Sequence, residues 1–294
     1  MSAIGGWFGR HWRGESGFWV SVLINALLIV PITIAGGTIV QVYAAVDGTP
    51  GTRITLGLVI AVVIALLAIW QLVGAWRVSS RGKAPERRWI SRWLARLTSL
   101  AIAVLAVAYL GLHAKGLGQI QLLATDSDEI GLRGYSLAVE GDQLRLNGIM
   151  AWSLVDKFMS ELDSNPQVRV VVLDSPGGHI AVGRRLADEI SRRRLDTLTT
   201  TQCASSCTIA FIAGQRRMMR PRATLGFHSL SAVFDGGKAD LLVQLSTQRN
   251  DEILRRAGVP DAFIQRIDAT PGTELWTPTM EELRQANIVT QVVR

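Results

Sequence analysis

A serine surrounded by small residues is the first feature of the C-terminal half that could do chemistry. Ser205 lies in residues 202–214, QCASSCTIAFIAG, where we expect a tight turn after a strand and then an apolar helix. A hydroxyl at a helix N-terminus lies where backbone N–H groups and the helix dipole stabilise an anion. Ser205 could therefore be a nucleophile, although Ser205 or Ser206 could instead simply cap the helix.

A histidine follows this serine at a suitable place. His228 ends the next predicted strand, in the stretch LGFHS. The chain has four histidines; His11 and His113 flank apolar segments, and His179 directly follows a glycine pair. His228 alone lies at a strand end after the candidate nucleophile, where a general base could be presented.

The glycine pair could supply the third part of such a site. Residues 170–178, VVVLDSPGG, predict a buried strand that ends in Gly177 and Gly178 before a helix begins. Glycines let the backbone take positive φ and let a ligand approach closely. Free N–H groups there can bind the charge that develops on a carbonyl oxygen. A plain strand-to-helix turn is the alternative.

The segments around these motifs alternate between strand and helix patterns. Such an alternation predicts an α/β domain with parallel strands. The predicted elements are a hairpin (136–139 and 143–146), helices at 151–162, 180–194 and 205–214, strands at 168–173, 195–200, 223–227 and 288–293, and further helices from about residue 238.

These motifs, in this order, resemble the Clp protease subunit (ClpP), a member of the ClpP/crotonase superfamily. The resemblance covers about residue 148 to the C-terminus and rests on SPGG, the Q-x-A-S stretch and the F-H pair. It implies a ClpP/crotonase-like spiral of β-β-α units, a homo-oligomer and a protein or peptide substrate. It also implies Ser205 as nucleophile, His228 as base, and the amides of Gly178 and Ser206 as the oxyanion hole.

The carboxylate of the implied Ser–His–acid triad is less well placed. The segment 276–283, WTPTMEEL, resembles the segment that follows the family's triad aspartate. This alignment places Glu274 closest to the aspartate position, although it needs a gap. Asp268 is the fallback. The membrane-bound signal-peptide-peptidase-A and NfeD groups are more distantly similar and use a Ser–Lys pair. Lys238 is the only lysine after the nucleophile. Because His228 falls at the family's histidine position, the Ser–His type is favoured.

Two cysteines bracket the candidate nucleophile. Cys203 and Cys207 are four residues apart, and one helical turn separates Cα atoms by about 6 Å, within reach of a disulfide. An oxidising exterior compartment would permit this bridge. The alternatives are two small buried side chains, or a Cys–His peptidase that uses a reduced Cys207. No metal site and no cofactor are predicted.

The N-terminal part has a different composition. Three apolar segments, at about 18–46, 54–76 and 94–112, are each long enough to cross a bilayer, so residues 1–113 are predicted to be a membrane domain. The first segment is too long for an ordinary cleaved signal peptide, so we expect it to be retained. Residues 114–134 form a predicted tether, and residues 135–294 the ClpP-like domain.

The basic residues predict the orientation. The linker between the second and third segments carries seven of them: Arg77, Arg81, Lys83, Arg87, Arg88, Arg92 and Arg96. Lys and Arg stay on the cytoplasmic side, so the N-terminus is predicted inside and the C-terminal domain outside a bacterial inner membrane. Most of the net charge of +7 then comes from basic residues that set the membrane orientation, so it does not indicate a nucleic-acid partner.

Together these features predict a membrane-anchored, ATP-independent serine peptidase that cleaves proteins or peptides at the outer face of the inner membrane. The alternative is a catalytically silent ClpP-like oligomeric scaffold or binding domain. The fold also permits a crotonase-like acyl-CoA enzyme, but coenzyme A is not expected outside the cytoplasm. A channel is unsupported, since the apolar segments contain almost no charge.

Overall fold

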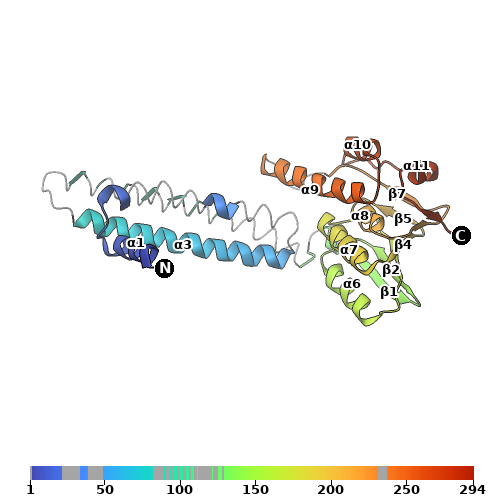
Figure 1. Ribbon diagram of the computed structural model, residues 1–294, viewed down its shortest axis with the longest axis horizontal. Coiled ribbons are helices and arrows are strands. Elements are labelled where there is room, and N and C mark those ends of the chain that lie inside the picture. The colour runs from blue at the N-terminus through green and yellow to red at the C-terminus, as the bar shows by residue number, and fades with distance from the viewer. Residues whose placement is uncertain are drawn as a thin grey trace. The chain divides into compact units, whose positions relative to one another are not determined.

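The protein, seen here as a computed structural model, divides into two compact units, residues 1–121 and 122–294. The structure describes residues 2–21, 34–38, 49–81, scattered positions between 89 and 111, residue 121, and residues 125–127, 129–230 and 237–294. Side chains are not described at residues 2–5 and 237–242. Figure 1 shows both units.

The N-terminal unit contains one long apolar helix, α3 (Pro50–Ser80). Thr49 caps it, because its hydroxyl accepts a hydrogen bond from the N–H of Thr52 at 3.2 Å. α3 has 31 residues, and its most apolar 18-residue stretch has a mean hydropathy of 2.8, so it is the one described helix long and apolar enough to cross a membrane. It contains the second predicted span, whereas the spans at 18–46 and 94–112 lie largely outside the described residues and stay predictions.

A shorter helix, α1 (Ser2–Arg13), packs against the C-terminal half of α3. The indole N–H of Trp70 donates to the carbonyl of Phe8 at 3.1 Å, and the guanidinium of Arg77 donates to the carbonyl of Trp12 at 2.7 Å. These contacts place the N-terminal tail beside the end of α3 that leads into the basic linker.

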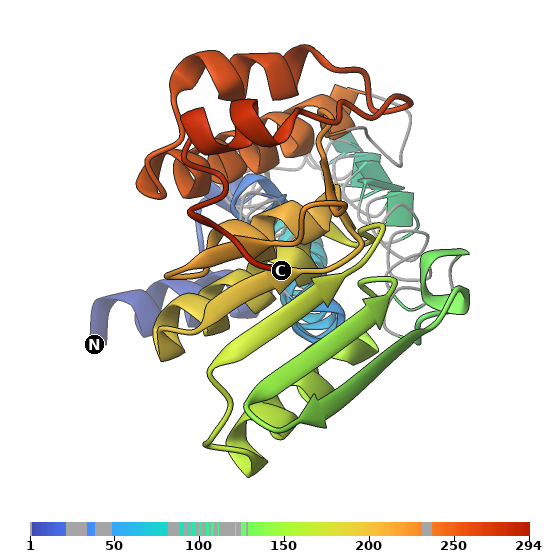
Figure 2. The ribbon, with the colours of Figure 1, turned by 90° about the vertical axis from the view of Figure 1, so that its right-hand side faces the viewer.

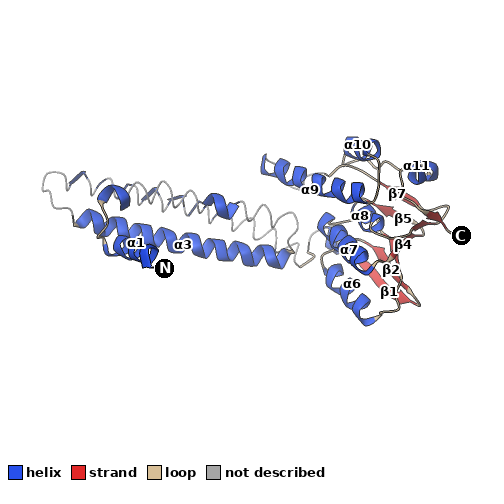
Figure 3. Ribbon diagram, in the orientation of Figure 1, coloured by secondary structure: helices blue, strands red, loops and turns tan. Residues whose placement is uncertain are grey.

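The C-terminal unit is built on a six-stranded sheet with the order β1-β2-β3-β4-β6-β8. β1 and β2 form the predicted antiparallel hairpin, and every other pair in this sheet is parallel. The strands are β1 (Tyr135–Glu140), β2 (Gln143–Gly148), β3 (Val170–Asp174), β4 (Asp196–Thr199), β6 (Arg217–Met219) and β8 (Gln291–Val292). They are red in Figure 3.

A smaller parallel sheet pairs β5 (Gln202–Ala204) with β7 (Thr224–Gly226). Helices α6 and α7 lie on one face of the larger sheet, as Figure 2 shows. The helices of this unit are α5 (Glu129–Leu132), α6 (Ser153–Ser164), α7 (Ile180–Arg193), α8 (Ser206–Ile212), α9 (Gly237–Arg256), α10 (Asp261–Ala269) and α11 (Met280–Gln285).

Strand β3 shows how the core is organised. Val171 and Leu173 point into the main core with helix residues such as Phe158, while Val170 and Val172 join a small cluster on the opposite face. All five residues of β3 are buried. A strand that is covered on both faces needs a continuous apolar run, which is what its sequence predicted.

The predicted α/β class and the order of the main elements are confirmed. Three times in residues 135–256 two strands precede a helix (β1-β2-α6, β4-β5-α8 and β6-β7-α9), the unit that the resemblance implies. The prediction missed β5 and β6, because three residues carry too little periodicity to identify a strand. The final strand is shorter than predicted, since Ile288 and Val289 bury their side chains in the core before β8 begins.

Candidate active site

The backbone at Ser205 has an unusual conformation. Ser205 lies between β5 and α8 with φ +55° and ψ −128°, and its side chain makes no capping bond to the helix. A non-glycine residue in such a region costs about 1–3 kcal/mol and persists only where its surroundings hold it. The N–H of Ser205 donates to the carbonyl of Gly226 at 2.9 Å, which ties this turn to the end of β7.

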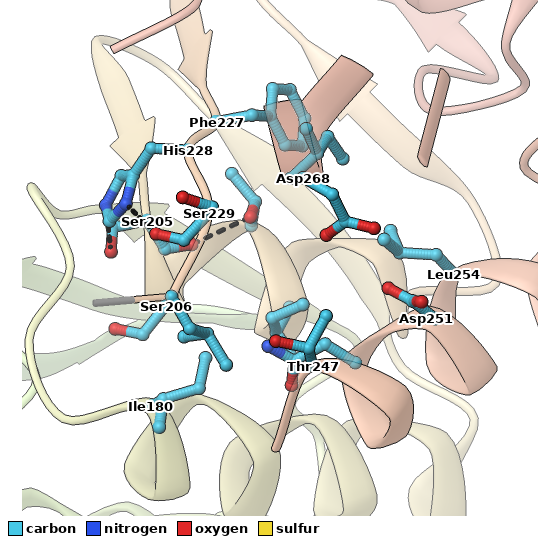
Figure 4. A pocket seen from close by; sticks show the side chains of 15 residues that line it. Ile180, Ser205, Ser206, Phe227, His228, Ser229, Thr247, Asp251, Leu254 and Asp268 are labelled. Carbon is cyan, nitrogen blue, oxygen red and sulfur yellow. Dashed lines mark hydrogen bonds between the residues drawn. The ribbon is translucent and has the colours of Figure 1, made fainter. Parts of the chain in front are cut away.

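The hydroxyl of Ser205 pairs with the imidazole of His228. Oγ of Ser205 lies 2.9 Å from Nε2 of His228, and Nδ1 of His228 lies 2.7 Å from the carbonyl oxygen of Ser229 (Figure 4). A carbonyl oxygen only accepts, so Nδ1 carries the hydrogen in this pair. Nε2 is then the acceptor for the proton of Ser205, which is the arrangement a general base needs.

The neighbours of His228 hold it in position. Phe227 exchanges two backbone hydrogen bonds with Trp276, each 2.8 Å long, and the N–H of Ser229 donates to the carbonyl of Thr270 at 2.8 Å. The ring of Phe227 also packs against Phe263 and Trp276, with centroids 5.4 and 6.0 Å away. The histidine is therefore anchored on both sides by the segment that follows α10.

The glycine pair lies between the turn that carries Ser205, which Gly177 contacts, and the backbone of Met150, which Gly178 contacts. Gly177 has φ +101°, and a Cβ there would lie 2.7 Å from both Ala204 O and Ser205 Cβ. Gly178 has φ +148°, and its Cβ would lie 2.6 Å from the carbonyl oxygen of Met150. Neither position tolerates a side chain.

Two N–H groups at this contact are available. The backbone hydrogen bonds of the described residues include none donated by Gly178 or Ser206. The Ser206 hydroxyl is buried and lies 3.5 Å from the sulfur of Met150. Unlike Ser205, it is therefore not paired with the histidine. These two amides stay the predicted oxyanion hole.

A disulfide spans the turn. Cys203 in β5 and Cys207 in α8 are bonded with their Cα atoms 5.4 Å apart, and both are fully buried. The bridge links the elements on either side of Ser205. In this oxidised form no thiol is left for a Cys–His pair.

Asp174, at the end of β3, supports the turn from further away. Its carboxylate accepts hydrogen bonds from the backbone N–H groups of Thr200 and Thr201, both at 2.8 Å. Burial alone would raise the pKa of Asp174, but hydrogen bonds from Thr200 and Thr201 outweigh it and lower the pKa. The sequence showed Asp174 only as a strand end, although three threonines at 199–201 are a possible signal for its partners.

The structure leaves the predicted acid and the alternative base open. Glu274 is exposed, and Asp268 lines the pocket beside the Ser–His pair, but no described hydrogen bond joins either carboxylate to His228. Lys238 lies in the first turn of α9 and its side chain is outside the described residues. Both assignments stay predictions.

A pocket opens beside Ser205 and His228, with walls from α8, α9 and α10. Asp251 and Asp268 lie on the side of the pocket away from His228 (Figure 4), and Asn250 also lines the pocket. Burial raises the pKa of Asp251, and the charge of Asp268 raises it further; burial likewise raises the pKa of Asp268. The sequence named only Asp268, because nothing in the pattern of α9 distinguishes Asp251 from a surface residue. The described residues hold no cluster of His, Cys, Asp or Glu suited to a metal.

Comparisons with known proteins give one kind of match. No protein-family model and no curated protein matches the chain. Among solved structures, a mutant of ClpP1 from Listeria monocytogenes is similar, with 16% sequence identity over 52% of this chain and 92% of that chain, at a TM-score of 0.43. At this level the likeness carries no conclusion about chemistry.

Proposed function

We propose that this chain is a membrane-anchored serine peptidase that cleaves proteins or peptides without ATP. One observation carries the proposal: Oγ of Ser205 lies 2.9 Å from Nε2 of His228, on a backbone held at φ +55°. A strained serine paired with an imidazole that can accept its proton is the arrangement of an activated nucleophile.

The reaction follows from these atoms. Ser205 Oγ attacks the substrate carbonyl as His228 Nε2 takes the hydroxyl proton, and the N–H groups of Gly178 and Ser206 receive the charge on the carbonyl oxygen. His228 then gives the proton to the leaving amine, and water hydrolyses the acyl-enzyme. Throughout, Nδ1–H stays bonded to the Ser229 carbonyl, whose dipole stabilises the imidazolium.

A serine-reactive probe tests this proposal. A fluorophosphonate should label the full-length protein in detergent, and Ser205→Ala should abolish labelling. Ser206→Ala is the matched control and should retain most of it, because the Ser206 hydroxyl is not paired with the histidine. Labelling that survives Ser205→Ala and disappears in Ser206→Ala would contradict the assignment.

We also propose that α3 crosses the bacterial inner membrane and that the C-terminal unit lies on the outer face. The packing of α1 against the C-terminal half of α3 supports this topology, because it brings the N-terminal tail and the basic linker to the same side. That side is the cytoplasm if the basic residues are retained there. A reporter active only outside the membrane, fused after Arg294, should be active; a stable but silent fusion would overturn the topology.

One observation favours the second candidate, a catalytically silent oligomeric scaffold. The partner of His228 Nδ1 is a backbone carbonyl, not a carboxylate, and a carbonyl stabilises an imidazolium less than a charged group does. A scaffold would show no probe labelling in the wild type. It would still associate with copies of itself, which cross-linking in membranes can measure.

A further inference from the structure

The pocket beside Ser205 has two chemically different walls. One part of the lining is apolar and includes Ile180, Ile209 and Phe227. On the side away from His228, the carboxylates of Asp251 and Asp268 face one another from α9 and α10 (Figure 4). The described lining contains no lysine or arginine.

The acidic wall keeps a net negative charge after its own ion pairs are counted. Arg255 is the cation beside it: its Nη2 lies 3.7 Å from Asp251 Oδ2, and its Nε lies 2.9 Å from Asp261 Oδ1. Among the described ion pairs, the two lining carboxylates, Asp251 and Asp268, have only the Arg255 guanidinium beside them, and Asp261 shares that guanidinium. The Asp251 side chain is only 15% exposed, while that of Arg255 is 52% exposed. Arg255 is thus shared and turned outward, so it neutralises the wall incompletely.

A separate observation points to a missing hydrogen-bond donor. Asn250 also lines the pocket, and its side-chain oxygen is buried and accepts no hydrogen bond from any described residue. A buried acceptor without a partner is costly, so it marks a place where a ligand N–H is expected. The wall therefore offers two carboxylates and an amide oxygen to a cationic donor.

We propose that this pocket receives the basic side chain, arginine or lysine, of the substrate residue whose carbonyl Ser205 attacks. The apolar lining suits the aliphatic stem of such a side chain, and the acidic wall suits its charged end. A serine peptidase sets its preference for that residue through the pocket beside the nucleophile. The inference rests on the proposed peptidase function and adds its substrate class.

The test compares substrates that differ only in charge. Full-length protein in detergent is given N-acetylated peptidyl coumarylamides that carry arginine, citrulline or leucine before the scissile bond. Citrulline keeps the shape of arginine without its charge, and the acetyl group removes the alternative cation of a free N-terminus. We expect kcat/KM for arginine to exceed that for citrulline by about tenfold to a hundredfold. Equal rates, or faster cleavage after leucine, would overturn the inference.

Two variants locate the effect. Asp251→Asn and Asp268→Asn should each lower kcat/KM for the arginine substrate about tenfold, and each should lower the ratio of the arginine rate to the citrulline rate by a similar factor. If Asp251→Asn fails to fold, Asp268→Asn still tests the acidic wall, because Asp268 is more exposed than Asp251. Asp188→Asn, at an exposed position of α7 away from the pocket, is the charge-matched control and should change neither substrate.

These measurements separate the inference from the function on which it rests. Loss of the citrulline and arginine rates together in Asp268→Asn would make Asp268 the triad acid and overturn its role in selection. Probe labelling at Ser205 without a preference for arginine would leave a peptidase but remove its basic specificity. No labelling and no hydrolysis of any substrate would remove the peptidase function itself.

Discussion

The turn that carries Ser205 and the acidic wall opposite it are built in contrasting ways. The turn is buried and held from three sides: by the disulfide, by the Gly226 carbonyl and by the close contact with Gly177. The wall consists of side chains on α9 and α10 that are partly exposed, and its main internal contact is one shared arginine.

The contrast separates two tasks. A nucleophile must be held within a fraction of an ångström, which requires packing and backbone hydrogen bonds. A charge that selects a side chain acts over several ångströms and tolerates an exposed, adjustable position. We therefore expect changes in the turn to affect every substrate, and changes in the wall to affect only the choice among them.

The largest effect is expected from the base. His228→Ala should lower kcat for arginine and leucine substrates alike, by about 10²–10⁴-fold, because the proton of Ser205 then has no acceptor. Lys238→Ala should leave both rates nearly unchanged. Steady-state hydrolysis measures this loss. An equal loss for the arginine and leucine substrates would support the distinction between the turn and the acidic wall. Activity lost in Lys238→Ala and kept in His228→Ala would instead indicate a Ser–Lys enzyme.

The contact between the glycine pair and the turn should give the next largest effect. Gly177→Ala puts a methyl group 2.7 Å from Ala204 O at a positive φ, and we expect a destabilisation of about 2–4 kcal/mol together with loss of activity on all substrates. The matched control is Gly141→Ala, since Gly141 has φ +63° but open space around its Cβ. That variant should lose only about 1 kcal/mol.

Thermal unfolding of the purified full chain, followed with the hydrolysis rate, measures both glycine variants. Equal midpoints and equal rates for Gly177→Ala and Gly141→Ala would show that the turn is not tightly held. The contrast with the acidic wall would then fail.

The disulfide should contribute least. The loop it closes is short, so its entropic contribution is at most about 2 kcal/mol, and its removal in a Cys203→Ala/Cys207→Ala variant should lower the rate several-fold for every substrate alike. Mass spectrometry of the unreduced wild type should find no free thiol. Complete alkylation without a reductant would contradict the bridge, and an altered arginine-to-citrulline ratio in the variant would contradict the division between turn and wall.

The sequence by itself determined the local parts of this protein. The β-branched run of β3, the apolar length of α3 and the glycine pair each express a preference of neighbouring residues, and each is found where it was predicted. The order of the motifs also singled out Ser205 and His228, which the fold brings to hydrogen-bonding distance. The close spacing of Cys203 and Cys207 likewise made their disulfide predictable.

Only the tertiary structure decided what those residues contact. The partner of His228 Nδ1 is a backbone carbonyl, and no side-chain pattern encodes a main-chain acceptor. Asp251 reaches the pocket because α9 packs beside α8, while in the sequence it is one acidic residue on a polar helix. The Ser205–His228 pair and the pocket residues on α9 and α10 come from segments about 20 to 60 residues apart. They depend on how helices and strands pack over those distances, which local preference and periodicity do not specify.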